Sequence, residues 1–514
     1  MTRGKDWGRD HAELTVRNLA GRSLSVGIPP QAVSWPAWPR RVARDRGTSP
    51  RRPCALARAS DWTFTCCLTR SGGRRLTVST PKRRSTVDAG VAADDGASIS
   101  ESPGWPLALL IPVGVLLNQS DVVFGINLSL ADPVALLLLL TATLFSNLKV
   151  PHRPLVFFLL VSTVTLSVSL WLVPLWVTSG ASLQTVLRDY AKACASFGFF
   201  VIGVNLVRVG RTWALMRAFV VAAVAVGAIG MLSLLLPAVR TLEVFFFGGF
   251  RFRGLINDPN YYSALAVTAL ALLWRDPRAR SWHRMVGTLS LIGATLATGS
   301  KTGAMVLAVW ISWRLLGDSR SPADAPASFG GRRLLTVAGL VITTALVLSF
   351  ANPDRSGKLA AAVASIPALN RIAPLLTNFG SAIAQDGSSR DAVWGNAMSL
   401  IEMSPIAGVG MGTYLEVSRA ANGVPLLAHN TVLQLAAEWG LPLAALFFIW
   451  AAGLLFRRPG PGSRATWLAG RDALLVLLVA STGVSLNNAR TFWLLLGVTW
   501  ASLISGGQGK PTGR

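Results

Sequence analysis

Residues 154–176 read PLVFFLLVSTVTLSVSLWLVPLW, a stretch without a single charged side chain. An α-helix needs about 20 mostly apolar residues to cross the hydrocarbon core of a bilayer. The rest of the chain follows this trend, because 51% of its 514 residues are hydrophobic and only 14% are charged. A soluble protein usually has about a quarter charged residues. The composition therefore predicts an integral membrane protein.

Apolar runs of similar length recur from Trp105 onward, and they predict an all-α, polytopic membrane domain over residues 101–508. We expect about twelve spanning helices. Their approximate centres fall in 105–120, 128–146, 154–176, 190–207, 213–236, 260–274, 285–299, 301–316, 333–350, 430–456, 472–486 and 491–505.

The Lys and Arg residues of the loops predict the orientation of these helices. With the N-terminus in the cytoplasm, the inner loops carry seventeen Lys and Arg, and the short outer loops carry seven. Short cytoplasmic loops of membrane proteins are enriched in Lys and Arg. We therefore expect both termini in the cytoplasm.

The first hundred residues differ from the remainder, with 18 Lys and Arg against 8 Asp and Glu. Residues 1–100 are rich in Arg, Ser, Pro and Gly, and they lack the apolar core of a signal peptide. This composition favours a disordered basic cytoplasmic tail or a mis-assigned translation start. A basic arm for anionic lipid or nucleic acid is the third interpretation, and we expect no nucleic-acid partner.

One outer loop is much longer than the others. It spans residues 351–428 between the predicted helices nine and ten. Apolar residues recur at helical spacing within 366–376 and again within 394–401. Long loops of compact proteins are usually functional or disordered. We expect helices in this extracytoplasmic loop, lying on the membrane as a lid.

Residues 251–260, RFRGLINDPN, form the first of three polar segments at the outer ends of helices. Asp258 before Pro259 is typical of a helix N-cap with proline in the first turn. Arg251 and Arg253 are not explained in this way, because the dipole of the following helix repels cations. Arginines beside a helix N-terminus are typical of an anion site.

Residues 298–302, TGSKT, form the second segment, a tight outer hairpin. A phosphate-binding Walker loop needs glycine directly before its lysine, and here Ser300 separates Gly299 from Lys301. The spacing therefore excludes an ATPase of that type. Two interpretations of Lys301 stay open, since its ammonium group can reach lipid headgroups or face an anionic substrate.

Residues 428–440, AHNTVLQLAAEWG, form the third segment and open the predicted tenth span. Asn430, Gln434 and Glu438 stand four residues apart and form one polar stripe on a helix. For Gln434 and Glu438, hydrogen bonds between helices are favoured over catalysis. His429 precedes a helix N-terminus, which disfavours its protonated form, so it can act as a general base near neutral pH.

Two motifs of the long loop complete the pattern that these three segments begin. They are GSSRDAVW at 387–394 and SPIAGVGMGTY at 404–414. In this order they resemble the O-antigen ligase and polymerase superfamily of bacterial envelope glycosyltransferases, over roughly residues 105–505. The resemblance implies a multi-pass, GT-C-like enzyme of the cytoplasmic (inner) membrane. It would move a glycan from an undecaprenyl diphosphate carrier to an acceptor hydroxyl on the outer face, with no metal, nucleotide or other cofactor.

The resemblance also assigns roles to individual residues. His429 matches the essential histidine of the family, and Arg253, with Arg251 beside it, matches the arginine before the sixth span. Arg390 matches a loop arginine that would contact the diphosphate, although a surface ion pair with a neighbouring aspartate is an alternative. Lys301 stands where the family has arginine, which keeps the charge but loses bidentate contact with phosphate oxygens.

Two questions stay open on the sequence. A flippase or secondary transporter is the rival to the enzyme, but such a protein should place ionisable residues in the middle of the membrane. The acceptor is a lipid, a glycan or a protein, so the sequence does not decide between a ligase and a polymerase. The donor lipid and the surrounding membrane lipids are the expected partners in each case.

Overall fold

The computed structural model describes residues 16–17, 23–24, 105–123, 126–145, 148–177, 182–317, 353–365, 369–377, 390–423 and 425–505. The chain separates into two units, Met1–Ala92 and Ala93–Arg514. In the first unit the structure describes one antiparallel pair of strands, β1 (Val16–Arg17) and β2 (Ser23–Leu24). The interpretations given above for residues 1–100 otherwise lie outside the described residues.

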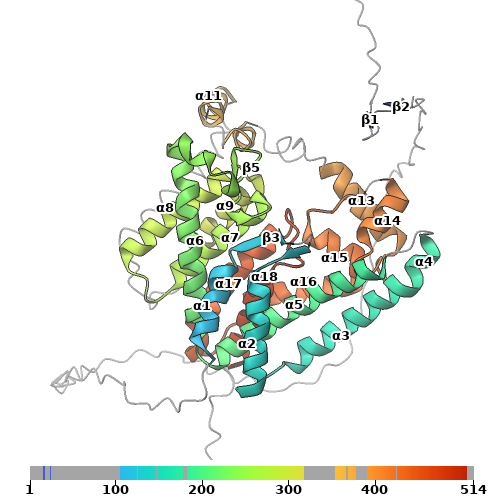
Figure 1. Cartoon of the computed structure of the whole chain (residues 1–514). Coiled ribbons are helices and arrows are strands. Elements are labelled where there is room, and N and C mark those ends of the chain that lie inside the picture. Colours follow the sequence, from blue (N-terminus) through green and yellow to red (C-terminus); the bar gives the residue numbers. More distant parts are fainter. Residues whose placement is uncertain are drawn as a thin grey trace, which may run out of the picture. The chain divides into compact units, whose positions relative to one another are not determined.

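Helices make up most of the second unit (Figure 1). The first half contains α1 (Leu107–Leu116), α2 (Ala131–Phe145), α3 (His152–Ser167), a π-helical turn (Val168–Leu172), α4 (Val173–Trp176), α5 (Leu183–Arg208), α6 (Thr212–Leu235), α7 (Pro259–Arg275), α8 (Ser281–Ala297) and α9 (Lys301–Gly317). The second half contains α11 (Pro353–Ala364), α13 (Arg390–Met403), α14 (Tyr414–Asn422), α15 (Thr431–Trp439), α16 (Leu441–Phe456), α17 (Arg464–Ala480) and α18 (Arg490–Ser505).

Each predicted spanning segment overlaps one of these helices, except 333–350, which lies outside the described residues. Among the described residues, three helical stretches are long and apolar enough to cross a membrane, namely His152–Trp176, Leu183–Arg208 and Thr212–Leu235. The helix predicted within 394–401 is present as α13, whereas the described part of 366–376 contains the short 3-10 helix Ala373–Leu376. The helices α11 and α14 lie in the same loop, outside both predicted windows. The structure is therefore that of a helical membrane protein, and the total of about twelve spans stays a prediction.

The all-α prediction misses several short strands. β3 (Gln119–Val123) pairs with β4 (Ile126–Leu128) and, in parallel, with β7 (Leu255–Ile256). A second small sheet joins β5 (Phe246–Phe247) to β6 (Arg251–Phe252). Ladders of two to five residues are too short to show the period-two pattern by which a strand is recognised in sequence. They matter because β6 and β7 hold the segment that contains Arg251 and Arg253.

Two predicted spans have different boundaries in the structure. The segment 430–456 is two helices, because Gly440 adopts φ 80° and ψ 158° between α15 and α16. The segment 472–486 is shifted, since α17 begins at Arg464 and ends at Ala480. The apolar pattern predicted that the span starts at Asp472, because charged residues usually mark the end of a span. In the structure Asp472 lies inside α17, where it is fully buried and ion-paired. Residues 481–489 are left as a non-helical loop, which we call the 481–489 loop.

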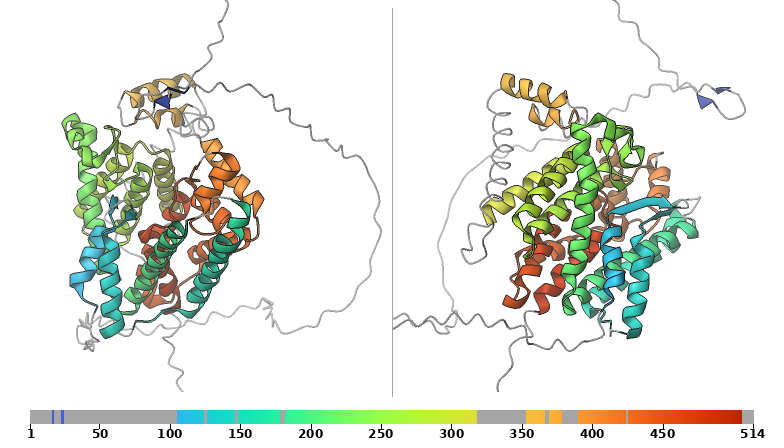
Figure 2. Two further views of the ribbon diagram at one scale, coloured as in Figure 1. Left: turned by 45° about the vertical axis from the view of Figure 1, so that its right-hand side comes forward. Right: turned by 60° about the vertical axis from the view of Figure 1, so that its left-hand side comes forward.

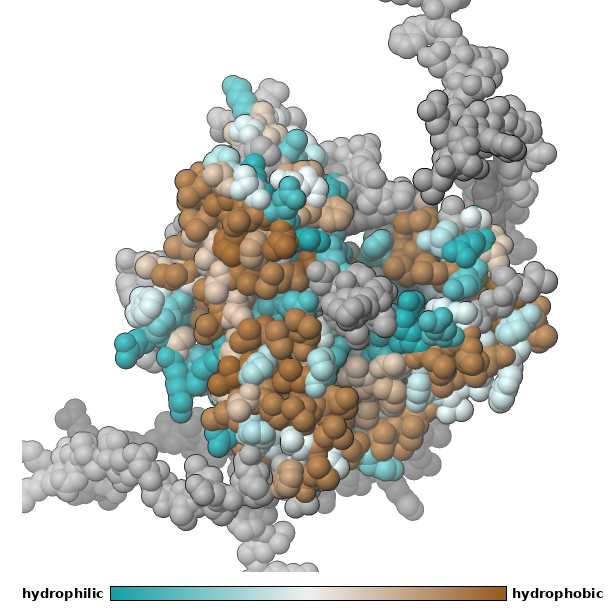
Figure 3. Space-filling model, in the orientation of Figure 1, coloured by the Kyte–Doolittle hydropathy of each residue, from teal (hydrophilic) through white to brown (hydrophobic). Residues whose placement is uncertain are grey.

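The helices pack into a bundle in which distant parts of the chain are neighbours. α5 packs against α18, α6 against α8, and α7 against α17, as the views in Figures 1 and 2 agree. The surface of the bundle is apolar over wide areas (Figure 3). Leu144 of α2, Leu175 of α4 and Leu235 of α6 are 74%, 78% and 71% exposed. Exposed apolar areas of this extent mark a surface that contacts lipid or protein.

One end of the bundle is held together by a buried ion-pair cluster. Asp472 of α17 is 0% exposed and accepts from Arg275 Nε at 2.7 Å and from Arg471 Nη2 at 2.7 Å. Arg314 Nη1 lies 3.7 Å from the same carboxylate, and Trp313 Nε1 donates to it at 3.2 Å. The cluster therefore joins the last turns of α7 and α9 to the first half of α17.

The opposite end is where α7, α9, α15 and α18 begin, and we call it the α15 end. Here Arg490 of α18 donates to Asp132 of α2 from Nε at 2.9 Å and from Nη2 at 2.7 Å. Three of the arginines that the sequence assigns to inner loops, Arg275, Arg314 and Arg471, thus meet at one end, around Asp472. The polar motifs predicted to bind substrate lie at the other.

Candidate functional site

Arg251 ties three elements together at the α15 end. Its side chain is buried, and Nε donates to the carbonyl oxygen of Thr298 at 3.0 Å. Nη2 donates to Oδ1 of Asn260 in the first turn of α7 at 3.1 Å. Arg251 therefore fixes β6 to the start of α7 and to the α8–α9 hairpin, so much of its hydrogen-bonding capacity is already used.

Arg253, two residues later, is held differently. Its backbone N–H donates to the carbonyl oxygen of Phe245 at 2.8 Å. Its Nε atom is buried and has no hydrogen-bond partner among the described residues. A buried N–H without a partner costs about 1–3 kcal/mol. An anion that accepted from this group would remove that cost.

The predicted N-cap of α7 is confirmed. Asp258 has extended backbone, and its Oδ1 accepts from the backbone N–H of Asn260 at 2.7 Å. Pro259 is the first residue of the helix. The carboxylate of Asp258 is thus used locally, as the sequence indicated.

Lys301 is the first residue of α9, and its side chain is partly exposed. Its neighbours pack closely against other elements of the α15 end. A Cβ atom built on Gly483 would lie 2.6 Å from Oγ1 of Thr302, so the start of α9 touches the 481–489 loop. Gly303 is packed equally closely against Ser263 of α7.

His429 has an unusual backbone. Its φ is 45°, a left-handed value that no other described residue except glycine adopts. Among residues with a side chain, histidine, asparagine and aspartate tolerate this region best. The side chain is exposed, whereas Ala428 before it is fully buried. Residues held in such conformations are frequent at functional sites.

The residues after His429 explain how this backbone is held. Oδ1 of Asn430 accepts from the N–H groups of Val432 at 3.0 Å and Leu433 at 3.2 Å, which caps α15. Thr431 binds the 481–489 loop three times: its N–H donates to Ser481 O at 2.7 Å, its Oγ1 donates to Val484 O at 2.7 Å, and Oγ1 accepts from Leu486 N at 2.7 Å. His429 is therefore presented from an anchored helix N-terminus.

The 481–489 loop is what brings the predicted residues to one place. It touches Thr302, which follows Lys301, and it holds Thr431, which lies two residues after His429. The hairpin that precedes Lys301 is bound by Arg251. Arg390 is the first residue of α13, which packs against α14 and α15 (Figure 1), and its side chain lies outside the described part.

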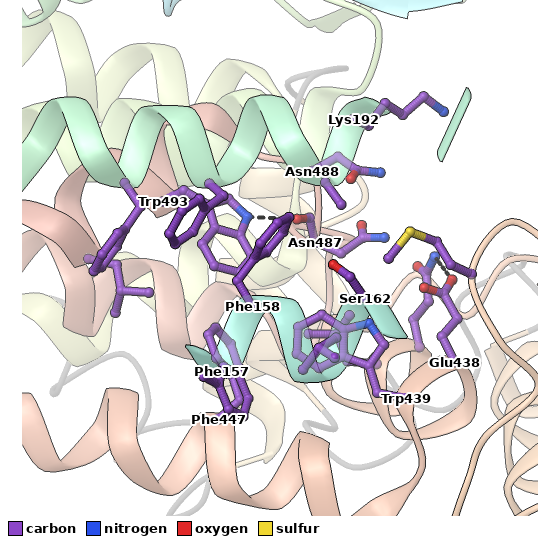
Figure 4. A pocket seen from close by; sticks show the side chains of 18 of the residues that line it. Phe157, Phe158, Ser162, Lys192, Glu438, Trp439, Phe447, Asn487, Asn488 and Trp493 are labelled. Carbon is purple, nitrogen blue, oxygen red and sulfur yellow. Dashed lines mark hydrogen bonds between the residues drawn. The ribbon is translucent and has the colours of Figure 1, made fainter. Parts of the chain in front are cut away.

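Gln434 and Glu438 lie on the same helix face, as the stripe predicted. Gln434 Nε2 donates to Glu438 Oε1 at 2.9 Å, so this hydrogen bond lies within α15 rather than between helices. Both side chains line a cavity of about 650 Å³ beside α15. Figure 4 shows Ser162, Lys192, Asn487 and Glu438 on one side of this cavity and Phe157, Phe158, Phe447 and Trp493 on the other.

The glycine-rich motif at 408–412 contributes Met411 to the lining of this cavity. The N–H of Val409 donates to Ala437 O at 2.7 Å, and the N–H of Gly410 donates to Glu438 O at 3.0 Å. Gly408 and Gly410 have φ of 71° and 84°, and a Cβ atom on either would collide with neighbouring backbone. The backbone of the motif is therefore hydrogen-bonded to the last turn of α15. This contact places Met411 at the cavity.

Sequence reasoning missed several residues of this cavity. Lys192 of α5 is one of the seven Lys and Arg that were counted in outer loops, and Asn487 and Asn488 lie between the predicted spans 472–486 and 491–505. No periodic pattern or motif marks them, because they approach α15 only through tertiary packing. Within the described ranges, no group of three or more His, Cys, Asp or Glu could hold a metal ion.

The family model described as O-antigen ligase matches residues 286–448. The matched segment is similar to the O-antigen ligase domain. It contains Lys301, Arg390, His429, Gln434 and Glu438, whereas the arginines of β6 and the following turn precede it. The predicted resemblance to the O-antigen ligase and polymerase superfamily is thereby confirmed. None of the curated proteins matches the chain.

Proposed function

We propose that this O-antigen ligase-type protein transfers a glycan from undecaprenyl diphosphate to an acceptor hydroxyl at the outer face of the cytoplasmic membrane. The observation that carries the proposal is the α15 end itself. There His429, in a left-handed conformation before an anchored helix, shares the 481–489 loop with the start of α9 at Lys301. Glycosyl transfer of the O-antigen ligase or polymerase type is what the matched family implies.

The proposed reaction needs a general base and a set of cations that bind the diphosphate. We call these cations, Arg253, Lys301 and Arg390, the clamp. His429 takes the proton of the acceptor hydroxyl as that oxygen bonds to the anomeric carbon of the donor glycan. The bond between the anomeric carbon and the diphosphate oxygen breaks, and the electron pair leaves with the diphosphate. Arg253 and Lys301 stabilise the charge that develops on the leaving oxygen. Arg390 is proposed to contact the same diphosphate from the long loop, and no metal or other cofactor is needed.

The two arginines of the first segment have different proposed roles. Arg251 is a positioning residue, because its guanidinium already binds Thr298 and Asn260. Arg253 contacts the diphosphate, because its Nε is buried without a partner among the described residues. Asn430 supports the reaction indirectly by capping the helix that presents His429.

Changes at Arg253 test the clamp. Arg253→Ala should weaken binding of the lipid diphosphate by about tenfold to a hundredfold, the value of one lost charge-assisted hydrogen bond of about 1.5–3 kcal/mol. Arg253→Lys should lose less donor affinity, since lysine keeps the charge but cannot make the bidentate contact of a guanidinium.

Lys301→Arg should be tolerated or bind the donor more tightly. Donor binding is measured with purified protein and labelled undecaprenyl diphosphate glycan.

The control for this measurement is Arg240→Ala, on the 3-10 helix Pro237–Thr241, where Nε of Arg240 donates to the carbonyl oxygen of Ser233. Equal donor affinity of Arg253→Ala and the wild type would remove Arg253 from the site. Transfer and binding are both measured with EDTA present, so a metal requirement appears as loss of wild-type activity.

The proposed orientation predicts the outcome of reporter fusions. An alkaline phosphatase fused after Asn422, at the end of α14, should be active, because the long loop is proposed to lie outside. A fusion after Gly460, between α16 and α17, should be inactive, because that loop is proposed to lie in the cytoplasm. A cytoplasmic reporter such as a fluorescent protein should give the reverse pattern. The opposite result would put His429 and the clamp on the wrong side of the membrane.

A further inference from the structure

The 481–489 loop contains no side chain that carries a charge or takes up a proton near neutral pH. Its sequence is STGVSLNNA, without Asp, Glu, His, Lys or Arg. The loop nevertheless contacts the starts of two helices that present proposed reaction groups, α15 after His429 and α9 at Lys301. Any contribution of this loop to the reaction must therefore come from the positions that it gives to other residues.

The hydroxyl group of Thr431 binds this loop both as a donor and as an acceptor. Its Oγ1 donates to Val484 O at 2.7 Å and accepts from Leu486 N at 2.7 Å. The residue is only 1% exposed, and its backbone N–H donates to Ser481 O at 2.7 Å. Three hydrogen bonds thus fix the first residue of α15, which is the second residue after His429.

The loop is itself held at both of its ends. The N–H of Gly483 donates to Ala480 O at 3.0 Å, which joins the loop to the last turn of α17. Near the other end, Nε1 of Trp493 in α18 donates to Asn487 O at 2.8 Å (Figure 4). A loop fixed to two helices of the bundle is a rigid support for the starts of α15 and α9.

The contact with α9 is made by the residue next to the contact with α15. A Cβ atom built on Gly483 would lie 2.6 Å from Oγ1 and 3.0 Å from Cγ2 of Thr302, which is 4% exposed and follows Lys301. Gly483 directly precedes Val484, whose carbonyl oxygen binds Thr431. The starts of α9 and α15 are therefore supported by two adjacent residues of one loop.

We infer that the 481–489 loop sets the position of the base relative to the clamp, and that Thr431 is a positioning residue for His429. The hydroxyl of Thr431 holds the helix start that presents the imidazole. The missing side chain of Gly483 lets the start of α9, with Lys301, approach the same loop. The inference rests on the proposed function, since it concerns the same base and the same clamp.

Thr431→Val tests the positioning of His429. Valine keeps the branched shape, but it deprives Val484 O and Leu486 N of the hydroxyl partner, so the start of α15 should move. A displacement of about 1 Å is enough to slow a reaction about 10²-fold, and we expect this loss in single-turnover transfer at saturating donor. Donor affinity should stay at the wild-type value. Thr431→Ser keeps the hydroxyl and should restore most of the rate.

The same substitution in the His429→Asn background separates positioning from a general loss of structure. No base remains to be positioned there, so adding Thr431→Val should not lower the residual rate further. A purely structural role of Thr431 would lower that rate again by the same factor. Melting temperatures of all variants are measured in parallel.

Thr268→Val is the matched control. It makes the same change at a fully buried residue of α7, whose Oγ1 donates to Ala264 O of its own helix at 2.8 Å. This variant should transfer glycan at the wild-type rate, because the hydroxyl of Thr268 joins no second element through that bond.

Gly483→Ala tests the contact with α9. Its methyl group would collide with Thr302, so the start of α9 should shift against the loop. Donor binding should weaken about threefold to tenfold, the size of one weakened hydrogen bond. Adding Thr302→Ala removes both Oγ1 and Cγ2 and should restore donor affinity. Thr302→Ala alone completes the double-mutant cycle.

Three results would overturn the inference: a wild-type transfer rate of Thr431→Val, a further loss from Thr431→Val in the His429→Asn background, or unchanged donor affinity of Gly483→Ala. Each of these results leaves the base and the clamp themselves in place. Near wild-type turnover of His429→Asn would instead refute the proposed function, because it concerns the base and not its support.

Discussion

His429→Gln is expected to slow glycan transfer by about 10²- to 10⁴-fold, the usual contribution of a general base. Glutamine keeps hydrogen bonding but cannot take the proton of the acceptor hydroxyl. Donor binding should stay near the wild-type value, because the proposed clamp uses Arg253 and Lys301. The measurement is single-turnover transfer from undecaprenyl diphosphate glycan, with donor affinity determined separately.

The backbone of His429 calls for a second variant at the same position. A backbone φ of 45° is less favourable for glutamine than for histidine. A displaced start of α15 is therefore a second cause by which His429→Gln would lose activity. His429→Asn separates the two causes, because asparagine tolerates left-handed backbone and still lacks a proton acceptor. Both variants should be equally inactive with unchanged melting temperatures. Near wild-type turnover of either would show that His429 is not the base.

Asp472→Asn is expected to lower the free energy of unfolding by about 3–5 kcal/mol, the typical cost of breaking a buried ion pair by removing one partner. The carboxylate of Asp472 is fully buried and is shared by Arg275, Arg314 and Arg471. Loss of its charge would separate α17 from the last turns of α7 and α9. Denaturant titration in detergent, followed by tryptophan fluorescence, measures the effect.

The matched control is Glu243→Gln, which removes a carboxylate on the exposed 3-10 helix Glu243–Phe245. Exposed changes usually stay within about 0.5 kcal/mol. Asp472→Asn combined with Arg471→Gln should recover part of the lost stability, because it removes one of the three guanidinium groups as well. A single variant as stable as the wild type would mean that the cluster does not hold the bundle end together.

Much of the fold could be predicted from local patterns. Apolar runs such as 154–176 reflect the cost of placing polar groups in lipid, and this cost acts on each segment by itself. The N-cap at Asp258 and the helix start at Asn430 are also local, since each side chain bonds backbone two or three residues away. The same holds for the chemistry of His429, which follows from its residue type and its place before a helix.

Other features arise only when distant segments meet. Asp472 looked like the limit of a span because its arginine partners Arg275 and Arg314 stand more than 150 residues away. Arg251 and Arg253 have different proposed roles because Thr298 and Asn260 bind the guanidinium of Arg251, whereas Nε of Arg253 has no partner among the described residues. Neither partner is visible in a local pattern.

The cavity shows the same division most clearly. Gln434 and Glu438 were recognised as one stripe, because four-residue spacing is a property of a single helix. Their surroundings come from α3, α5, α14, α16 and the 481–489 loop, which no periodicity connects. The sequence by itself therefore determined the membrane class, the helices and the residues capable of chemistry. Only the packing of the bundle decided which of them share a site, because proximity between distant segments depends on how whole helices fit together.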